Sequence, residues 1–127
     1  MGHSYRDLVV WQRAITMVTE VYHATQSFPR QETYGLTSQL QRSAVSVASN
    51  IAEGQGRISK AEFRQFLGMA RGSLLEMETQ LVIAANLGYI SGATANHLSV
   101  CSGEVSRLLY GLMQSLQPRE VFRKTGN

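Results

Sequence analysis

With 127 residues, 43% of them hydrophobic and 17% charged, the chain is long enough for one globular domain with its own core, and its composition excludes a disordered protein. Its 12 basic and 9 acidic residues give a net charge of +3, which alone is weak evidence for nucleic-acid binding. The lone Cys101 excludes an internal disulfide and a zinc site built from cysteines, and no apolar run reaches the length of a membrane span.

The first predicted helix covers about residues 6–27. Its apolar residues recur every three or four positions, the spacing of a stripe on one helix face. That stripe consists of Leu8, Trp11, Ile15, Val18 and Tyr22. Pro29 ends the helix, because proline disfavours helix at the residue before it, and residues 29–35 form a connection.

The second predicted helix covers about residues 36–53. Its apolar stripe consists of Leu40, Ala44, Val47 and Ile51. Small residues flank this stripe and allow another helix to approach closely: Ser43, Ser46, Ala48, Ser49 and Ala52. Gly54 and Gly56 are expected to stop the helix, with Gly54 as a C′ residue with positive φ.

The third predicted helix, residues 60–87, begins with a capping box of Ser59 and Glu62 and ends at Gly88. Its stripe has a heptad-like spacing: Phe63, Leu67, Ala70, Leu74, Met77, Leu81 and Ala84. The fourth helix, residues 91–117, has one stripe with Leu98, Cys101, Val105, Leu108, Leu112 and Ser115, and a second with Leu109, Met113 and Leu116. Residues 118–127 form a polar, basic tail.

Short connections between long amphipathic helices favour antiparallel neighbours. We therefore predict an all-α single domain over residues 1–127, folded as an up-down-up-down four-helix bundle. Four apolar residues lie off the main stripes and would be exposed in a monomer: Val9, Met17, Leu109 and Met113. Because soluble monomers tend to avoid exposed apolar patches, we expect a closed homo-oligomer.

Basic residues are concentrated between positions 39 and 71, a segment with five basic and two acidic residues and therefore a local charge of +3. The five basic residues are Arg42, Arg57, Lys60, Arg64 and Arg71. On the third helix, residues 60, 64 and 71 lie within about 40° of one line. Gly68 lies beside that line and adds no bulk, and the helix N-terminus adds partial positive charge. These residues are candidates for a phosphate-binding track. The alternative is a solvated basic face that is partly paired with glutamates.

Other motifs point to structure rather than to catalysis. Asn50 and Glu53 lie on one helix face before Gly54, and we expect them to hold the following loop by hydrogen bonds to its backbone. The glycine-rich residues 54–57 lack the preceding strand or the Lys-Ser/Thr ending of a nucleotide-binding loop.

The histidines and the cysteine do not suggest an active site. Glu20 and His23 have the spacing used in di-iron bundles, but His97 lacks the matching second glutamate. Cys101, on the predicted core stripe, is expected to be an inert buried thiol. We expect no catalytic residues, no metal and no cofactor.

Several segments together resemble the sequence pattern of a known protein family. Residues 39–54, which include Asn50, Glu53 and Gly54, resemble the signature of the four-helix-bundle proteins encoded in intervening sequences of bacterial 23S rRNA genes. Residues 8–14, Phe28-Pro29 with Glu32, Tyr34-Gly35-Leu36, and the third-helix segment from Phe63 to Glu78 extend the resemblance over about residues 5–90. The fourth helix matches by pattern only.

This resemblance implies an antiparallel four-helix bundle. The family is similar to the accessory protein of diversity-generating retroelements, which forms homopentamers and has a basic surface that binds nucleic acid and a reverse transcriptase. A homopentamer is therefore the favoured assembly.

The sequence as a whole indicates a non-enzymatic, oligomeric helical bundle that binds structured RNA or DNA. The alternative is a scaffold that recruits a protein partner, with charges that serve subunit pairing. Residues 1–7 lack the apolar stretch of a signal peptide, so we expect a cytoplasmic protein without membrane contact.

Overall fold

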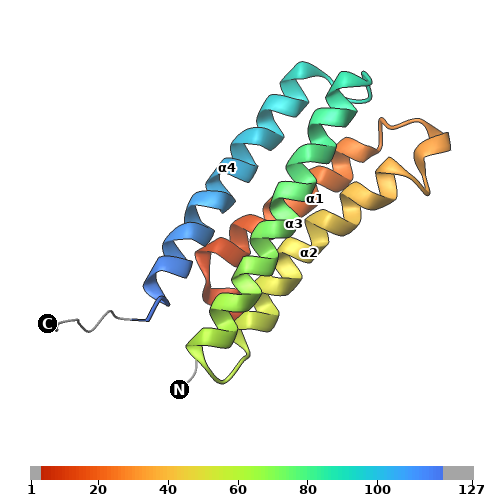
Figure 1. Ribbon diagram of the computed structural model, residues 1–127. Helices are drawn as coiled ribbons and strands as arrows, with labels where there is room; N and C mark the ends of the chain where they lie inside the picture. Colours follow the sequence, from red (N-terminus) through yellow and green to blue (C-terminus); the bar gives the residue numbers. More distant parts are fainter. Residues whose placement is uncertain (1–3, 119–127) are drawn as a thin grey trace, which may run out of the picture.

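Within residues 4–118, which the computed structural model describes, the chain forms four α-helices and two short 3-10 helices. They are η1 (Tyr5–Asp7), α1 (Val9–Thr25), η2 (Arg30–Glu32), α2 (Leu36–Gln55), α3 (Lys60–Asn86) and α4 (Gly92–Ser115). Successive α-helices run in opposite directions, and each packs against two neighbours (Figure 1). The predicted all-α, antiparallel four-helix bundle is confirmed. No helix in this described part is both long and apolar enough to cross a membrane.

Local signals explain where α3 and α4 begin. The Ser59 hydroxyl accepts a hydrogen bond of 3.1 Å from the backbone N–H of Glu62, as the predicted capping box requires. Ser91 caps α4 in the same way through the N–H of Thr94, also at 3.1 Å. Between these helices Gly88 has a φ of +77°, a conformation that strongly favours glycine.

The N-terminal helix begins later than predicted. Tyr5–Asp7 forms the separate 3-10 helix η1, and Leu8 is extended before α1 starts at Val9. At the other end of the chain, the predicted basic tail lies outside the described residues except for Pro118.

The predicted end of α2 at Gly54 is wrong. The helix continues to Gln55, and Gly54 is a buried helical residue. Its missing side chain serves the contact with α3, because a Cβ at position 54 would lie 2.7 Å from the Cβ of Phe66 and 3.0 Å from Cδ1 of Phe63. Gly54 thus allows the two helix backbones to approach closely.

The predicted core face of α1 is also wrong. The stripe that enters the core is Val10, Ala14, Met17 and Val21. In the predicted stripe, Ile15 and Tyr22 are 38% and 43% exposed. Both stripes have helical spacing, so periodicity alone cannot choose between them. Leu8, Trp11 and Val18 of the predicted stripe are half-buried at the edge of the core, and only Ile15 and Tyr22 are exposed.

The other helices follow the predicted stripes more closely. Every apolar residue of the α2 stripe is fully buried, and the α3 stripe is buried from Leu67 to Ala84. In α4, Leu98 and Val105 are buried as predicted, together with Leu109 from the second stripe, whereas Cys101 is half-buried and Ser115 is exposed. Burial of Met17 and Leu109 removes both from the predicted set of exposed apolar residues.

A polar clamp joins the α1–α2 and α3–α4 connections at one end of the bundle. Glu32 accepts two hydrogen bonds, one of 3.0 Å from the N–H of Leu36 and one of 2.9 Å from the hydroxyl of Tyr89. Ser27 donates to the Tyr89 carbonyl at 2.7 Å. Glu32 therefore caps α2 and ties it to the opposite connection.

Candidate nucleic-acid interface

The basic residues around the α2–α3 turn occupy an exposed end of the bundle. Arg57 lies in the turn, and its guanidinium carbon is 4.5 Å from the centre of the Phe66 ring. This cation–π contact holds the guanidinium against the surface while leaving its edge open to a phosphate. Lys60 opens α3 directly after the Ser59 cap and is exposed.

Arg64 lies one turn after Lys60 and reaches toward α4. Its Nε donates a hydrogen bond of 3.2 Å to the carbonyl of Met113 in the last turn of α4. Carbonyls at a helix C-terminus carry partial negative charge, so this contact stabilises that turn. Lys60 and Arg64 also line a surface hollow of about 840 Å³ between the start of α3 and the end of α4.

Arg71 extends this basic face along α3, whereas Arg42 does not belong to it. Arg71 is exposed, and neither neighbouring glycine, Gly68 or Gly72, has another atom within 4 Å of where its Cβ would be. Arg42 lines a different hollow, between α2 and α3, together with Ser73. Because Ser73 and Arg71 differ by about 200° around α3, the predicted residues divide into two groups.

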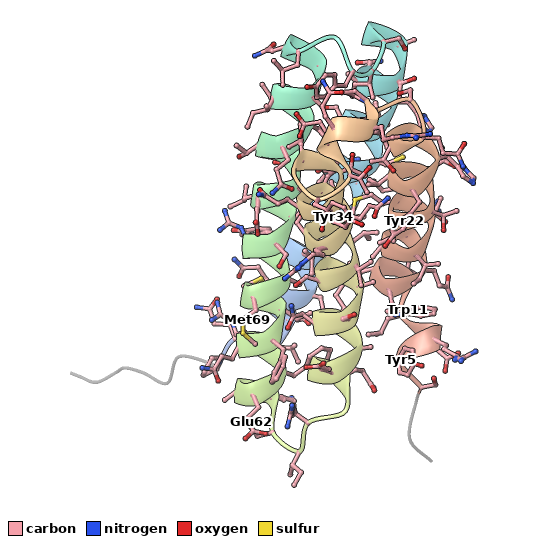
Figure 2. All side chains as sticks on the ribbon, turned by 90° about the vertical axis from the view of Figure 1, so that its right-hand side faces the viewer. Tyr5, Trp11, Tyr22, Tyr34, Glu62 and Met69 are labelled. Atoms are coloured by element: carbon pink, nitrogen blue, oxygen red, sulfur yellow. The ribbon has the colours of Figure 1, made fainter. Side chains whose placement is uncertain are left out.

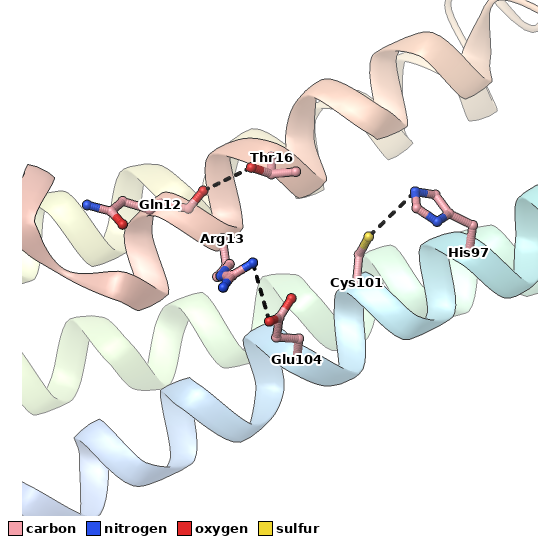
Figure 3. A network of polar contacts seen from close by, with 6 residues as sticks. All are labelled: Gln12, Arg13, Thr16, His97, Cys101 and Glu104. Carbon is pink, nitrogen blue, oxygen red and sulfur yellow. Dashed lines mark hydrogen bonds and ion pairs between the residues drawn. The ribbon is translucent and has the colours of Figure 1, made fainter.

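The described ion pairs lie away from these five basic residues. Within residues 4–118, they connect Arg13 to Glu104 at 3.5 Å and His97 to Glu20 at 3.3 Å, both between α1 and α4 (Figure 3 shows the first). No carboxylate of the same part of the chain pairs with the five basic side chains. The pairing with glutamates is therefore not present in this part of the structure, and a solvated basic face remains the alternative to a phosphate-binding track.

Asn50 and Glu53 do not hold the α2–α3 loop as expected. The Asn50 amide donates to the carbonyl and the hydroxyl of Ser46, at 2.9 and 3.0 Å, one turn earlier in its own helix. Ser46 in turn shares a hydrogen bond of 2.8 Å with Ser73 of α3. Glu53 is exposed, and no described hydrogen bond joins its carboxylate to the loop. Asn50 thus belongs to the α2–α3 contact.

The thiol and imidazole lie together on the α1–α4 side. The Cys101 sulfur is 3.8 Å from Nε2 of His97 (Figure 3), which also faces Glu20. Burial raises the pKa of the Cys101 thiol, and the Glu20 and Glu104 carboxylates raise it further. A protonated thiol is a poor nucleophile. Residues 4–118 contain no group of three or more His, Cys, Asp or Glu side chains placed to hold a metal ion.

Some polar residues with clear roles escaped the sequence analysis. Glu32 and Tyr89 are 57 positions apart, and Arg64 and Met113 are 49 apart, so no local pattern connects them. A weak signal did exist for Glu32, since a carboxylate just before a helix is a common cap for its free N–H groups.

The geometry defines a small antiparallel four-helix bundle whose basic side chains at one end and along α3 form no ion pair with a carboxylate of residues 4–118. The chain belongs to the 23S rRNA-intervening sequence protein family, whose family model matches residues 6–111. A solved structure of a protein of unknown function from the S23 ribosomal protein family of Bacteroides thetaiotaomicron is similar, with a TM-score of 0.78 and 22% identity over 84% of this chain and 99% of that one. This likeness shows the fold. No curated protein matches the chain.

Proposed function

We propose that this is a non-enzymatic, homo-oligomeric bundle protein that binds structured RNA through the basic face formed by Arg57, Lys60, Arg64 and Arg71. The observation that carries the proposal is the separation of charge. The described ion pairs lie between α1 and α4, whereas the cations of the basic face have no carboxylate partner among residues 4–118.

The basic face suits a phosphate backbone more than bases. Arginine guanidinium groups contact phosphate oxygens in pairs, and Lys60 adds its charge where the N-terminus of α3 is already partly positive. The exposed Gly68 leaves room beside this line for a backbone to approach. Recognition by such a face depends on shape and charge rather than on sequence.

Salt dependence of RNA retention tests the proposal. Each phosphate contact releases counterions, so log K should fall by about 0.7–0.9 per contact for each decade of salt. The variant Lys60→Glu/Arg71→Glu should lose RNA retention in a mobility-shift assay while keeping its helical circular dichroism. Arg64 is left intact, because its bond to Met113 also supports α4.

A matched control separates the effect of where the charges are changed from the effect of the net charge on RNA retention. The variant Arg6→Glu/Arg30→Glu changes the charge by the same amount on exposed residues outside the basic face, and it should retain RNA. Equal retention by both variants, or none by the parent at low salt, contradicts RNA binding by this face. Equal competition by duplex DNA would extend the ligand to DNA.

The second candidate function is a scaffold that recruits a protein partner and binds no nucleic acid. The exposed apolar side chains of α1, including Ile15 and Tyr22, support it. This scaffold is the function that remains if the parent protein retains no RNA.

A further inference from the structure

A polar hollow of about 490 Å³ lies on the seam between α2 and α3, away from the basic face. Segments far apart in the sequence meet there: Tyr34 from the α1–α2 connection, Arg42 from α2, and Ser73 and Glu76 from α3. Figure 2 shows Tyr34 in front of α2. This residue is 95% exposed, so one side chain at the rim offers an aromatic surface to solvent.

The polar groups at the floor of this hollow already have hydrogen-bond partners. Ser46 and Ser73 share a hydrogen bond, and the buried Ser43 donates to the buried Gln80 at 2.7 Å. These bonds fix the separation of the two helices and leave no need for a ligand at the floor. Any recognition must therefore use the groups at the wall and rim.

The wall carries one cation and one anion that do not pair. Arg42 on α2 and Glu76 on α3 both line the hollow, yet no ion pair forms between them. Within residues 4–118 the Glu76 carboxylate accepts a single described hydrogen bond, a long one of 3.4 Å from Gln80, and the Arg42 guanidinium donates none. The hollow thus offers a donor fork from α2 and an acceptor pair from α3, beside an exposed tyrosine.

We propose that this hollow binds an unpaired guanine of the RNA, and the proposal rests on the RNA-binding function. The Arg42 guanidinium donates to O6 and N7 of the base, the commonest arginine–guanine contact. The Glu76 carboxylate accepts from N1–H and the N2 amino group. Tyr34 stacks on the face of the base, as aromatic side chains do with splayed-out RNA bases.

The same geometry disfavours the other bases. Adenine has an amino group in place of O6, which would face the donors of Arg42, and a ring acceptor at N1, which would face the Glu76 carboxylate. Cytosine presents an acceptor at N3, and uracil offers only one N–H. Inosine keeps O6, N7 and N1–H but lacks the N2 amino group, so it should bind between guanosine and adenosine.

Titration with mononucleotides tests the hollow independently of the RNA backbone. We expect GMP to shift the backbone amide signals of residues 34–46 and 73–76 in NMR spectra, with an affinity at least about tenfold above that for AMP. IMP should fall between the two. Glu76→Gln should remove most of this preference, and Tyr34→Ala should weaken GMP and AMP alike.

Matched controls come from the same chain. Glu62→Gln changes an exposed carboxylate at the start of α3, and Tyr110→Ala removes an exposed tyrosine of α4, so both should leave GMP binding unchanged. Equal shifts with GMP and AMP, or an unchanged preference in Glu76→Gln, overturn the proposal. GMP binding by a protein that retains no RNA would instead confirm the hollow as a guanine site and contradict the RNA-binding function.

Discussion

Replacement of Gly54 should destabilise the bundle strongly, even where it adds only one methyl group. An alanine Cβ would lie 2.7 Å from the Cβ of Phe66, an atom close to the α3 backbone that cannot move freely. We expect Gly54→Ala to lower the free energy of unfolding by about 1–3 kcal/mol. Urea unfolding would measure this change.

Gly72 provides the matched control for this substitution. It is also inside a helix, but nothing lies within 4 Å of where its Cβ would be. Since alanine is a better helix former than glycine, Gly72→Ala should stabilise the protein by up to about 1 kcal/mol. Stabilisation by both substitutions would show that α2 and α3 are not in close contact at Gly54.

Glu32 should make stability depend on pH. The N–H of Leu36 and then the Tyr89 hydroxyl lower the pKa of this carboxyl in the folded chain. Because this pKa is lowered, the ionised Glu32 carboxylate stabilises the folded chain fully above the ordinary carboxyl pKa of about 4.3. This stabilisation is lost as the pH falls through the lowered pKa of the folded state. Melting temperatures between pH 7 and pH 3 should therefore fall more steeply for the parent than for Glu32→Gln.

The Tyr89 hydroxyl provides an independent check at the alkaline end. Its hydrogen bond to Glu32 and burial raise its pKa, so its contribution is lost as the pH rises through that raised value. Tyr89→Phe should reduce the dependence of stability on pH at both the acid and the alkaline end. Parallel melting curves for the parent and both variants would contradict a role for this clamp.

At the scale of the helices, α1 is where the structure corrects the sequence most. Met17 is fully buried, whereas Ile15 is largely outside the core of the bundle. Met17→Ala should lower the free energy of unfolding by about 2–5 kcal/mol, because it leaves a cavity within the chain. This loss should not depend on protein concentration, and a larger loss for Ile15→Ala in dilute protein would restore the predicted face.

Hydrophobic periodicity predicts the buried faces of α2 and α3 but not that of α1, for a physical reason. In α2 the residues outside the apolar stripe are mainly small or polar, so the periodic pattern has one solution. In α3 further apolar residues are exposed, among them Met69, Leu75 and Val82, but they do not continue the unbroken spacing of the seven-residue stripe. In α1 two apolar stripes share the same spacing, and only the neighbouring helices decide which one is buried. Gly54 was misread because local chemistry suggested a helix end, while its actual role depends on Phe66 in another helix.

The candidate site likewise has features that the sequence predicts and features that it does not predict. The alignment of Lys60, Arg64 and Arg71 follows from positions within one helix, which the sequence alone supplies. The place of Arg42 depends on how α2 and α3 are aligned, and the bond from Arg64 to Met113 depends on where α4 ends. Contacts between distant segments could not be predicted from periodicity.

At the scale of the whole molecule, the basic face and the aromatic row of α1 lie on different elements. The unpaired cations lie at the α2–α3 turn and along α3, whereas Figure 2 shows Tyr5, Trp11 and Tyr22 following one another along η1 and α1. The Trp11 ring meets Tyr5 edge-on, with 5.1 Å between the ring centres. Exposed apolar side chains also lie on α3, among them Met69, Leu75 and Val82. The row on η1 and α1 carries no residue of the basic face, so subunit contacts there would leave that face open to a polyanion.

We therefore expect α1 to contact another copy of the chain. Ile15 and Tyr22, seven positions apart on one line of α1, are 38% and 43% exposed, and a soluble monomer would leave this apolar pair in water. Light scattering should give a mass several times 14.1 kDa, and about 70 kDa for the pentamer that the family resemblance implies. Ile15→Glu should shift the protein toward a single chain with its helical circular dichroism intact.

Ile58→Glu provides the matched control for this last experiment. Ile58 is a fully exposed isoleucine in the α2–α3 turn, so the substitution makes the same chemical change outside α1. A charge placed on an apolar contact between subunits is desolvated without a partner, whereas a charge at an open turn stays hydrated. Dissociation by Ile15→Glu but not by Ile58→Glu would place the subunit contact on α1. A parent protein with the mass of one chain at micromolar concentration would contradict the assembly itself.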